Sequence, residues 1–146
     1  MINNLGGMDM DKIIKMLLAG ILAGFILFLV ASISYKYTGR ISDPSLSALF
    51  RDEISMKWFY KLLMLNVGMG VIMAVFYALM SKGMPGGNII KGIFWGFVVW
   101  AILISQPLIM SLVAGKFTAD LIISWLAQGL VSYVAAGFCI SLIYKD

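Results

Sequence analysis

The chain has 146 residues, of which 62% are hydrophobic and only 12% charged, with a formal net charge of +4. A soluble domain is nearer to half apolar, with about a quarter of its residues charged, so this composition excludes an ordinary water-soluble fold. The length suits a single membrane domain over residues 1–146, with no separate soluble domain. The excess of Lys and Arg lies near the ends of the apolar segments, which favours contact with anionic lipid headgroups and not nucleic-acid binding.

Four long apolar segments dominate the sequence, and none has an acid, an arginine or a histidine in its central turns. Each is long enough to cross a hydrocarbon core about 30 Å thick, which requires about 20 helical residues. We therefore predict an all-α integral membrane four-helix bundle. Its spans are expected at about 13–35, 59–80, 89–113 and 121–144. The short connections after the second and third spans favour antiparallel neighbours and an up-down-up-down order.

The long connection between the first two spans has a helical pattern of its own. Asp43 can cap a helix that has Pro44 at its first position. Apolar residues then recur at spacings of three and four, at Leu46, Leu49, Phe50 and Ile54. This pattern predicts a short amphipathic helix at about 44–54 that lies in the membrane interface. An ordered loop that caps the bundle is the alternative.

Small residues at four-residue spacing indicate where helices approach each other closely, because helix association in lipid depends on backbone contact. The first span contains Gly20 and Gly24, and the third opens with Gly92 and Gly96. Gly70 continues the pattern in the second span. Helix packing is the main interpretation of these residues, and the lining of a pore or a lipid site is the alternative.

Uncharged polar residues within the spans are the main candidates for a functional site. They comprise Asn66, Gln106 beside Pro107, and the residues Ser124, Gln128 and Ser132, which share one helical face. Polar side chains in hydrocarbon need hydrogen-bond partners. They therefore either join the helices and partner subunits or line a polar pathway or small binding pocket. Pro107 is expected to kink the third span, because proline removes a backbone hydrogen bond.

The two halves of the sequence show a weak similarity. Residues 13–20 (IIKMLLAG) match residues 89–96 (IIKGIFWG) at an offset of 76 positions. A duplicated helical hairpin is one explanation, and chance similarity between apolar helices is the other. Four spans place both termini on one side, with 5 Lys or Arg residues on that side and 6 on the other. The positive-inside rule therefore gives no clear orientation, and cytoplasmic termini in a bacterial or archaeal inner membrane are a working assumption.

The residues required for common membrane chemistry are missing. The chain has no histidine, a single cysteine (Cys139) and no acid within the spans. Haem, metal and proton-relay sites generally need such residues, so we expect no catalytic residue, cofactor or metal site. The favoured function is an accessory or structural subunit of a larger membrane complex. The alternatives are a homo-oligomeric channel or carrier for a small uncharged solute, and an interfacial lipid-binding scaffold. The expected partners are the lipid bilayer and either other subunits or further copies of the chain.

Overall fold

The computed structural model describes residues 10–38, 56–115 and 117–145, and within them all regular secondary structure is helical. In chain order the elements are α1 (Met10–Thr38), α3 (Met56–Met80), a 3-10 turn (Ser81–Gly83), α4 (Asn88–Trp100), a π-helical stretch (Ala101–Ser105), α5 (Gln106–Val113) and α6 (Ala119–Ile143). The π-helical stretch joins α4 to α5 without a break, so these three pieces form one long rod.

The prediction of four long apolar helices is confirmed. Stretches of 24 to 28 residues are long and apolar enough to cross a membrane, at Met10–Ile33, Met56–Gly83, Asn88–Val113 and Ala119–Ile143. The predicted spans agree with these stretches to within a few residues at each end. The four helices are therefore compatible with an integral membrane protein. The amphipathic helix predicted at about 44–54 lies outside the described residues.

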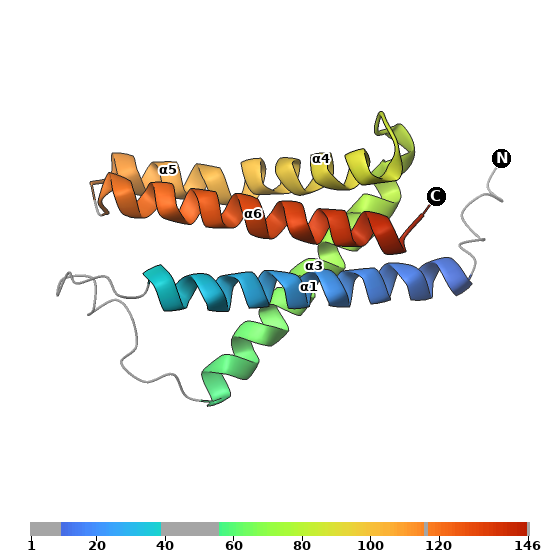
Figure 1. Ribbon diagram of the computed structural model, residues 1–146, viewed down its shortest axis with the longest axis horizontal. Helices are drawn as coiled ribbons and strands as arrows, with labels where there is room; N and C mark the ends of the chain where they lie inside the picture. Colours follow the sequence, from blue (N-terminus) through green and yellow to red (C-terminus); the bar gives the residue numbers. More distant parts are fainter. Residues whose placement is uncertain (1–9, 39–55, 116, 146) are drawn as a thin grey trace.

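The turns between the helices use glycines in a conformation that other residues rarely adopt. Gly86 has a φ of 96° in the turn before α4, and Gly115 has a φ of 69° just after α5. With no Cβ, glycine enters this left-handed region at little cost, so both connections can reverse the chain within a few residues. As a result α3 ends, α4 begins and α6 ends at the same end of the molecule, and α1 begins at that end too (Figure 1).

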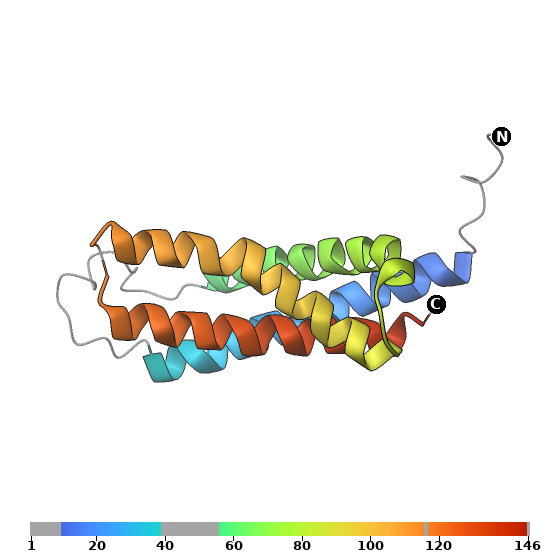
Figure 2. The same ribbon diagram turned by 90° about the horizontal axis from the view of Figure 1, so that it is seen from above.

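The helices pack as two pairs. α1 packs mainly on α3 and on α6, and α4 packs mainly on α6. In Figure 1, α3 crosses α1 at a steep angle and diverges from the rest of the molecule towards Met56. Figure 2 shows that the rod of α4 and α5 crosses α6 and changes direction along its length. The change of direction agrees with the kink expected from Pro107, which lies just beyond the π-helical stretch.

The crossing of α1 and α3 depends on direct backbone contact. A Cβ added at Gly70 would collide with the carbonyl oxygen of Gly20 and with the backbone nitrogen of Gly24. A Cβ at Gly20 would lie 2.6 Å from the Cα of Val71. All three glycines predicted on the first two spans are thus placed at one contact, where any larger residue would push the helices apart.

The crossing of α4 and α6 is built in the same way. A Cβ at Gly137 would collide with the carbonyl oxygen of Gly92 and lie 2.8 Å from the backbone nitrogen of Gly96. A Cβ at Gly96 would lie 2.7 Å from the Cα of Val134. The predicted pair on the third span therefore meets α6 at Gly137, which the sequence analysis did not single out.

These equivalent contacts place the two hairpins in register. Gly92 and Gly96 follow Gly20 and Gly24 by 72 residues, so that GILAGF at 20–25 corresponds to GIFWGF at 92–97. On the second helix of each hairpin the offset is 67 residues. That offset pairs identical residues at Trp58 and Trp125, Val67 and Val134, Gly70 and Gly137, and Tyr77 and Tyr144. The structure thus supports two similar hairpins, but in a register different from the offset of 76 read from the sequence.

The main buried cluster lies in the half of the molecule towards the start of α1, while Leu121 and Ile122 are buried apart from it at the start of α6. The indole nitrogen of Trp95 donates a hydrogen bond of 3.1 Å to the carbonyl oxygen of Met73, which joins α4 to α3. The rings of Tyr77 and Tyr144 pack edge to face, with centroids 6.3 Å apart. Because α3 diverges from its neighbours on the other side of this core, the opposite half of the molecule is left open.

Candidate binding cavity

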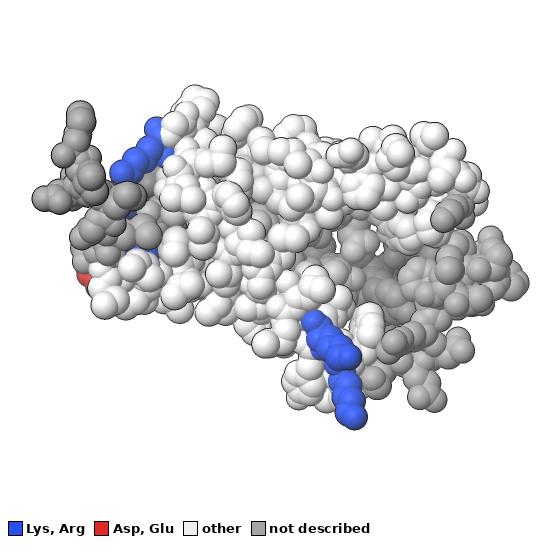
Figure 3. Space-filling model, turned by 180° about the vertical axis from the view of Figure 1, so that it is seen from behind, with Lys and Arg blue, Asp and Glu red and all other residues white. Residues whose placement is uncertain are grey.

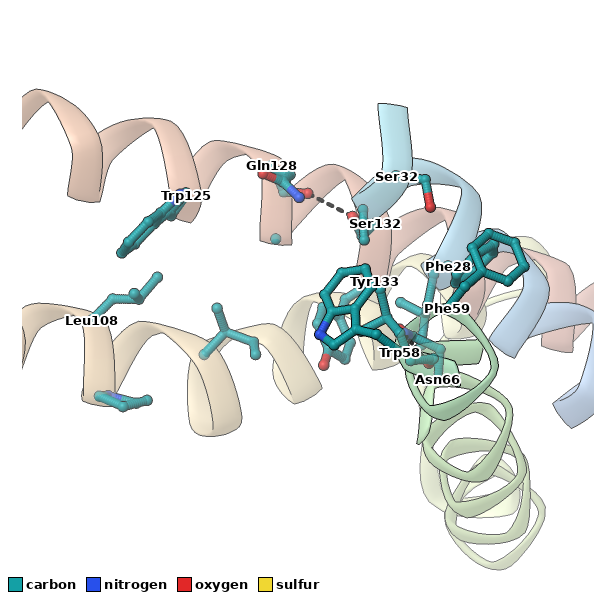
Figure 4. A pocket seen from close by; sticks show the side chains of 16 residues that line it. Phe28, Ser32, Trp58, Phe59, Asn66, Leu108, Trp125, Gln128, Ser132 and Tyr133 are labelled. Carbon is teal, nitrogen blue, oxygen red and sulfur yellow. Dashed lines mark hydrogen bonds between the residues drawn. The ribbon is translucent and has the colours of Figure 1, made fainter. Parts of the chain in front are cut away.

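A cavity of about 680 Å³ occupies the open half of the molecule. Residues of α1, α3, the rod of α4 and α5, and α6 all line it, as Figure 4 shows. It lies near the C-terminal end of α1 and the N-terminal ends of α3 and α6. Its volume is in the range of about 300–1,000 Å³ that is typical of small-molecule sites.

The cavity follows from how the helices leave their crossing points. α3 is held to α1 at Gly70 and moves away from α4 and α5 towards its N-terminus. Neither the π-helical stretch Ala101–Ser105 nor α5 has a buried residue. The described residues of α3 and α5 therefore leave a space between the two helices, and the surface is hollowed there (Figure 3).

The π-helical stretch shapes one wall of the cavity. Pro107 has no N–H with which to bond the carbonyl of Leu103, and it lines the cavity together with Ile104 and Leu108. The hydroxyl of Ser105 donates to the carbonyl of Ala101 within the widened turn. Short π-helical segments inside α-helices are frequent at functional sites.

The structure brings three of the predicted polar residues together. Asn66, Gln128 and Ser132 all line the cavity, although they come from different helices or turns. Two are partly committed to their own helix: the amide nitrogen of Asn66 donates to the Leu62 carbonyl at 2.8 Å, and the Ser132 hydroxyl donates to the backbone carbonyl of Gln128 at 2.8 Å. The Gln128 side-chain amide makes no hydrogen bond within the described part of the chain.

Two other predicted polar residues are not part of the cavity lining. Gln106 and Ser124 are both exposed, and the Ser124 hydroxyl donates to the carbonyl of Asp120 at 2.8 Å. The face that Ser124 was expected to share with Gln128 and Ser132 is therefore split, with its first member outside the cavity. The predicted glycines Gly20, Gly24, Gly70, Gly92 and Gly96 lie at the helix crossings and not in the cavity.

Several aromatic residues that were not predicted as site residues also line the cavity. Trp58 and Phe59 enter from α3, and Trp125 and Tyr133 from α6. The rings of Phe28 and Phe59 pack edge to face at a centroid distance of 4.9 Å and form part of the wall. Tryptophans at span ends are expected at the lipid interface. The signal that could have singled out Trp58 and Trp125 is their recurrence at the offset of 67 residues.

The lining contains no charged side chain among the described residues. Lys57 and Lys61 are exposed on the first turns of α3 but do not line the cavity. On the face seen in Figure 3, the Lys and Arg side chains form two well-separated groups with an uncharged surface between them. The cavity is thus mainly apolar, with a few neutral hydrogen-bonding groups.

These observations define a class of protein: an all-helical chain of four long apolar helices, built as two similar hairpins around an uncharged cavity. No protein-family model, curated protein or solved structure matches the chain. In the described residues, no group of three or more His, Cys, Asp or Glu side chains is arranged to hold a metal ion. What the arrangement offers chemically is apolar contact and neutral hydrogen bonding.

Proposed function

We propose that the chain is a non-catalytic integral membrane protein that binds an uncharged hydrophobic molecule in the cavity between α3 and α5. In this proposal the helices cross the bilayer in up-down-up-down order. The observation that carries the proposal is the cavity itself, because all four long helices contribute to it and none contributes a charge. Ligand sites are typically concave and mainly apolar, with a few polar groups that fix orientation.

The position of the cavity supports entry of a ligand sideways from the lipid. The hollow lies along the length of the helices, between α3 and α5, where the two helices are not packed against each other. With the helices across a bilayer, this surface faces lipid and not water. A molecule dissolved in the hydrocarbon can then reach the cavity without crossing the filled half of the bundle.

A pair of matched substitutions tests this proposal. Ala31 lines the cavity, whereas Ala127 is exposed on the surface of α6. We expect wild type and the Ala127→Phe variant, extracted gently from membranes, to carry a bound non-protein mass in native mass spectra. Ala31→Phe fills the cavity and should lose that mass. If Ala31→Phe retains the same bound mass as wild type, the cavity is not the binding site.

An accessory subunit of a larger complex remains the second candidate, and one observation favours it. Only 11% of an 18-residue apolar window within Asn88–Val113 is buried inside the chain, against 39% of the corresponding window within Met10–Ile33. The outer surface of Asn88–Val113 is thus free for a partner subunit as well as for lipid. Crosslinking in native membranes from Ile93 or Phe97, both exposed on α4, should then yield a specific heteromeric product. Crosslinking to lipid alone would count against this candidate.

The homo-oligomeric channel receives less support from the packing. A polar path through one chain would have to pass Ala19, Ala23, Met73 and Tyr77, which are at most 2% exposed and fill the other half of the bundle. A pore would therefore have to form between copies of the chain. The alternative of an interfacial scaffold depends on residues 44–54, which lie outside the described part of the chain.

A further inference from the structure

We infer that the cavity takes a neutral, hydrocarbon-soluble molecule with carbonyl acceptors, such as a quinone, and that donors on α6 bind those carbonyls. The donors are Gln128, Tyr133 and Trp125. This inference rests on the proposed function and specifies the chemistry of the ligand.

The three donors on α6 have no hydrogen-bond partner among the described residues. The Gln128 amide, the Tyr133 hydroxyl and the Trp125 indole N–H line the cavity and make no hydrogen bond within the described chain. Two other tryptophans are satisfied, since Trp95 and Trp100 donate to backbone carbonyls of neighbouring helices at 3.1 and 3.0 Å. The donor atoms are accessible and not sealed in the core, since no fully buried side-chain nitrogen or oxygen among the described residues lacks a partner. Polar groups in an apolar site need a hydrogen-bond partner, and an occupant of the cavity can supply one.

The three donors are spread along α6. Trp125, Gln128 and Tyr133 are separated by three and five residues, which at 3.6 residues per turn spreads them over an arc of about 140° of α6, and all three line the cavity. At 1.5 Å per residue they extend over about 12 Å of the helix. Donors spread in this way suit a ligand with more than one acceptor better than a single hydroxyl group.

The polar side chains of the cavity lie far from the ends of their helices. Gln128 lies nine residues after the start of α6, and Asn66 ten residues after the start of α3. These separations correspond to about 14 and 15 Å along the helices, and for α6, which runs along the long axis of the molecule, about 14 Å is roughly half the thickness of a hydrocarbon core of about 30 Å. The ester carbonyls and phosphate of a phospholipid stay near the headgroups and do not reach this depth. The polar end of the ligand must therefore be one that resides in hydrocarbon.

The described lining of the cavity is uncharged. No Asp, Glu, Lys or Arg among the described residues lines the cavity, so these residues offer no counter-ion to a charged ligand group. A carboxylate, phosphate or amine is therefore disfavoured. The rings of Phe28, Trp58 and Phe59 instead offer the flat apolar surface that favours an aromatic or quinonoid ring.

The two hairpins give independent support for the location. At the offset of 67 residues Tyr133 corresponds to Asn66 and Trp125 to Trp58, and all four line the same cavity. Equivalent turns of both hairpins thus supply polar or amphipathic side chains to one site. Because the Asn66 amide already donates to Leu62, the unpaired donors come mainly from α6.

The test measures quenching of tryptophan emission in phosphatidylcholine nanodiscs with two probes. One is decylubiquinone, which has carbonyl acceptors and a short tail, and the other is 1-bromododecane, which is apolar and also quenches. We expect saturable quenching by both, with the quinone at least about tenfold tighter, as two or more hydrogen bonds would give. Gln128→Leu and Tyr133→Phe should each reduce that preference, while Gln106→Leu, which changes an exposed amide outside the cavity, should leave it unchanged.

The outcomes separate this inference from the proposed function. Equal affinity for both probes, or a quinone affinity unaffected by both Gln128→Leu and Tyr133→Phe, would overturn the carbonyl ligand while leaving an apolar guest in place. Unsaturable quenching by both probes in wild type, identical to that in Ala31→Phe, would overturn both. Circular dichroism of each variant establishes that a lost preference does not come from a lost fold.

Discussion

Gly70 and Gly137 occupy the same position in the two hairpins. A Cβ on either residue would collide with the carbonyl oxygen of the first glycine, and press on the backbone nitrogen of the second, in a Gly-x-x-x-Gly pair on the partner helix. The packing of both hairpins therefore depends on the absence of one side-chain atom. Adding a single methyl group, as in a Gly→Ala substitution, should therefore lower the stability measurably.

Gly70→Ala should destabilise the contact between α1 and α3. The added Cβ meets backbone atoms of Gly20 and Gly24, which cannot move without shifting a whole helix. We expect a loss of about 1–3 kcal/mol, the usual cost of overpacking, measured by denaturant titration in mixed micelles. Gly68→Ala is the matched control, because a Cβ there meets nothing within 4 Å. Equal stability of the two variants would contradict the crossing described here.

Gly137→Ala should cost a similar amount at the contact between α4 and α6, where the Cβ meets backbone atoms of Gly92 and Gly96. The same titration provides the measurement. Since the two crossings share no partner residue, the double variant with Gly70→Ala should show nearly additive losses. A much smaller effect at Gly137 than at Gly70 would argue that the hairpins are not built alike.

Trp95→Phe and Trp125→Phe should have different effects, the first on stability and the second on ligand binding. Trp95 is buried and its indole donates to the Met73 carbonyl at 3.1 Å, so its replacement removes a bond that joins two helices. We expect about 1–2 kcal/mol of destabilisation for Trp95→Phe. Trp125 makes no hydrogen bond within the described chain, so Trp125→Phe should leave stability nearly unchanged and weaken ligand retention. The reverse pattern would remove Trp125 from the proposed site.

Pro107→Ala should stabilise the fold and weaken binding. Alanine restores an N–H that can bond the Leu103 carbonyl, and proline within a helix typically costs about 3 kcal/mol. The rod of α4 and α5 should straighten, which moves the wall formed by Pro107 and Leu108 relative to α6. Thermal unfolding measures the first effect and the bound mass in native spectra the second. Unchanged retention in a more stable variant would show that the bend does not shape the site.

The four helices could be predicted from the sequence because length and hydropathy alone decide whether a segment can cross a bilayer. The glycine pairs on the first and third spans were also recognised, since close backbone approach leaves a spacing of four. The register between the hairpins was not recognised correctly. The offset of 76 matches IIK at 13–15 to IIK at 89–91, but these residues do not make the helix contacts, and the glycines that do are 72 residues apart.

The site was only partly predictable, for a physical reason. In a soluble helix, apolar residues mark the face that packs inward. In a membrane helix both the lipid-facing and the bundle-facing sides are apolar, so sequence does not fix which side Gln106 or Ser124 takes. Asn66 was grouped with them on polarity alone, and Gln128 and Ser132 on polarity together with their four-residue spacing from Ser124. Their place in the cavity depends on where α3 diverges from α5, which is a property of the crossing at Gly70.

The most direct test of the proposed function is the native mass spectrum of the protein taken from its own membrane, recorded for wild type, Ala127→Phe and Ala31→Phe. We expect one bound uncharged hydrophobic molecule on wild type and on Ala127→Phe, and none on Ala31→Phe. An identical bound mass on all three, or no bound mass on wild type at any collision energy that keeps the fold intact, would contradict it.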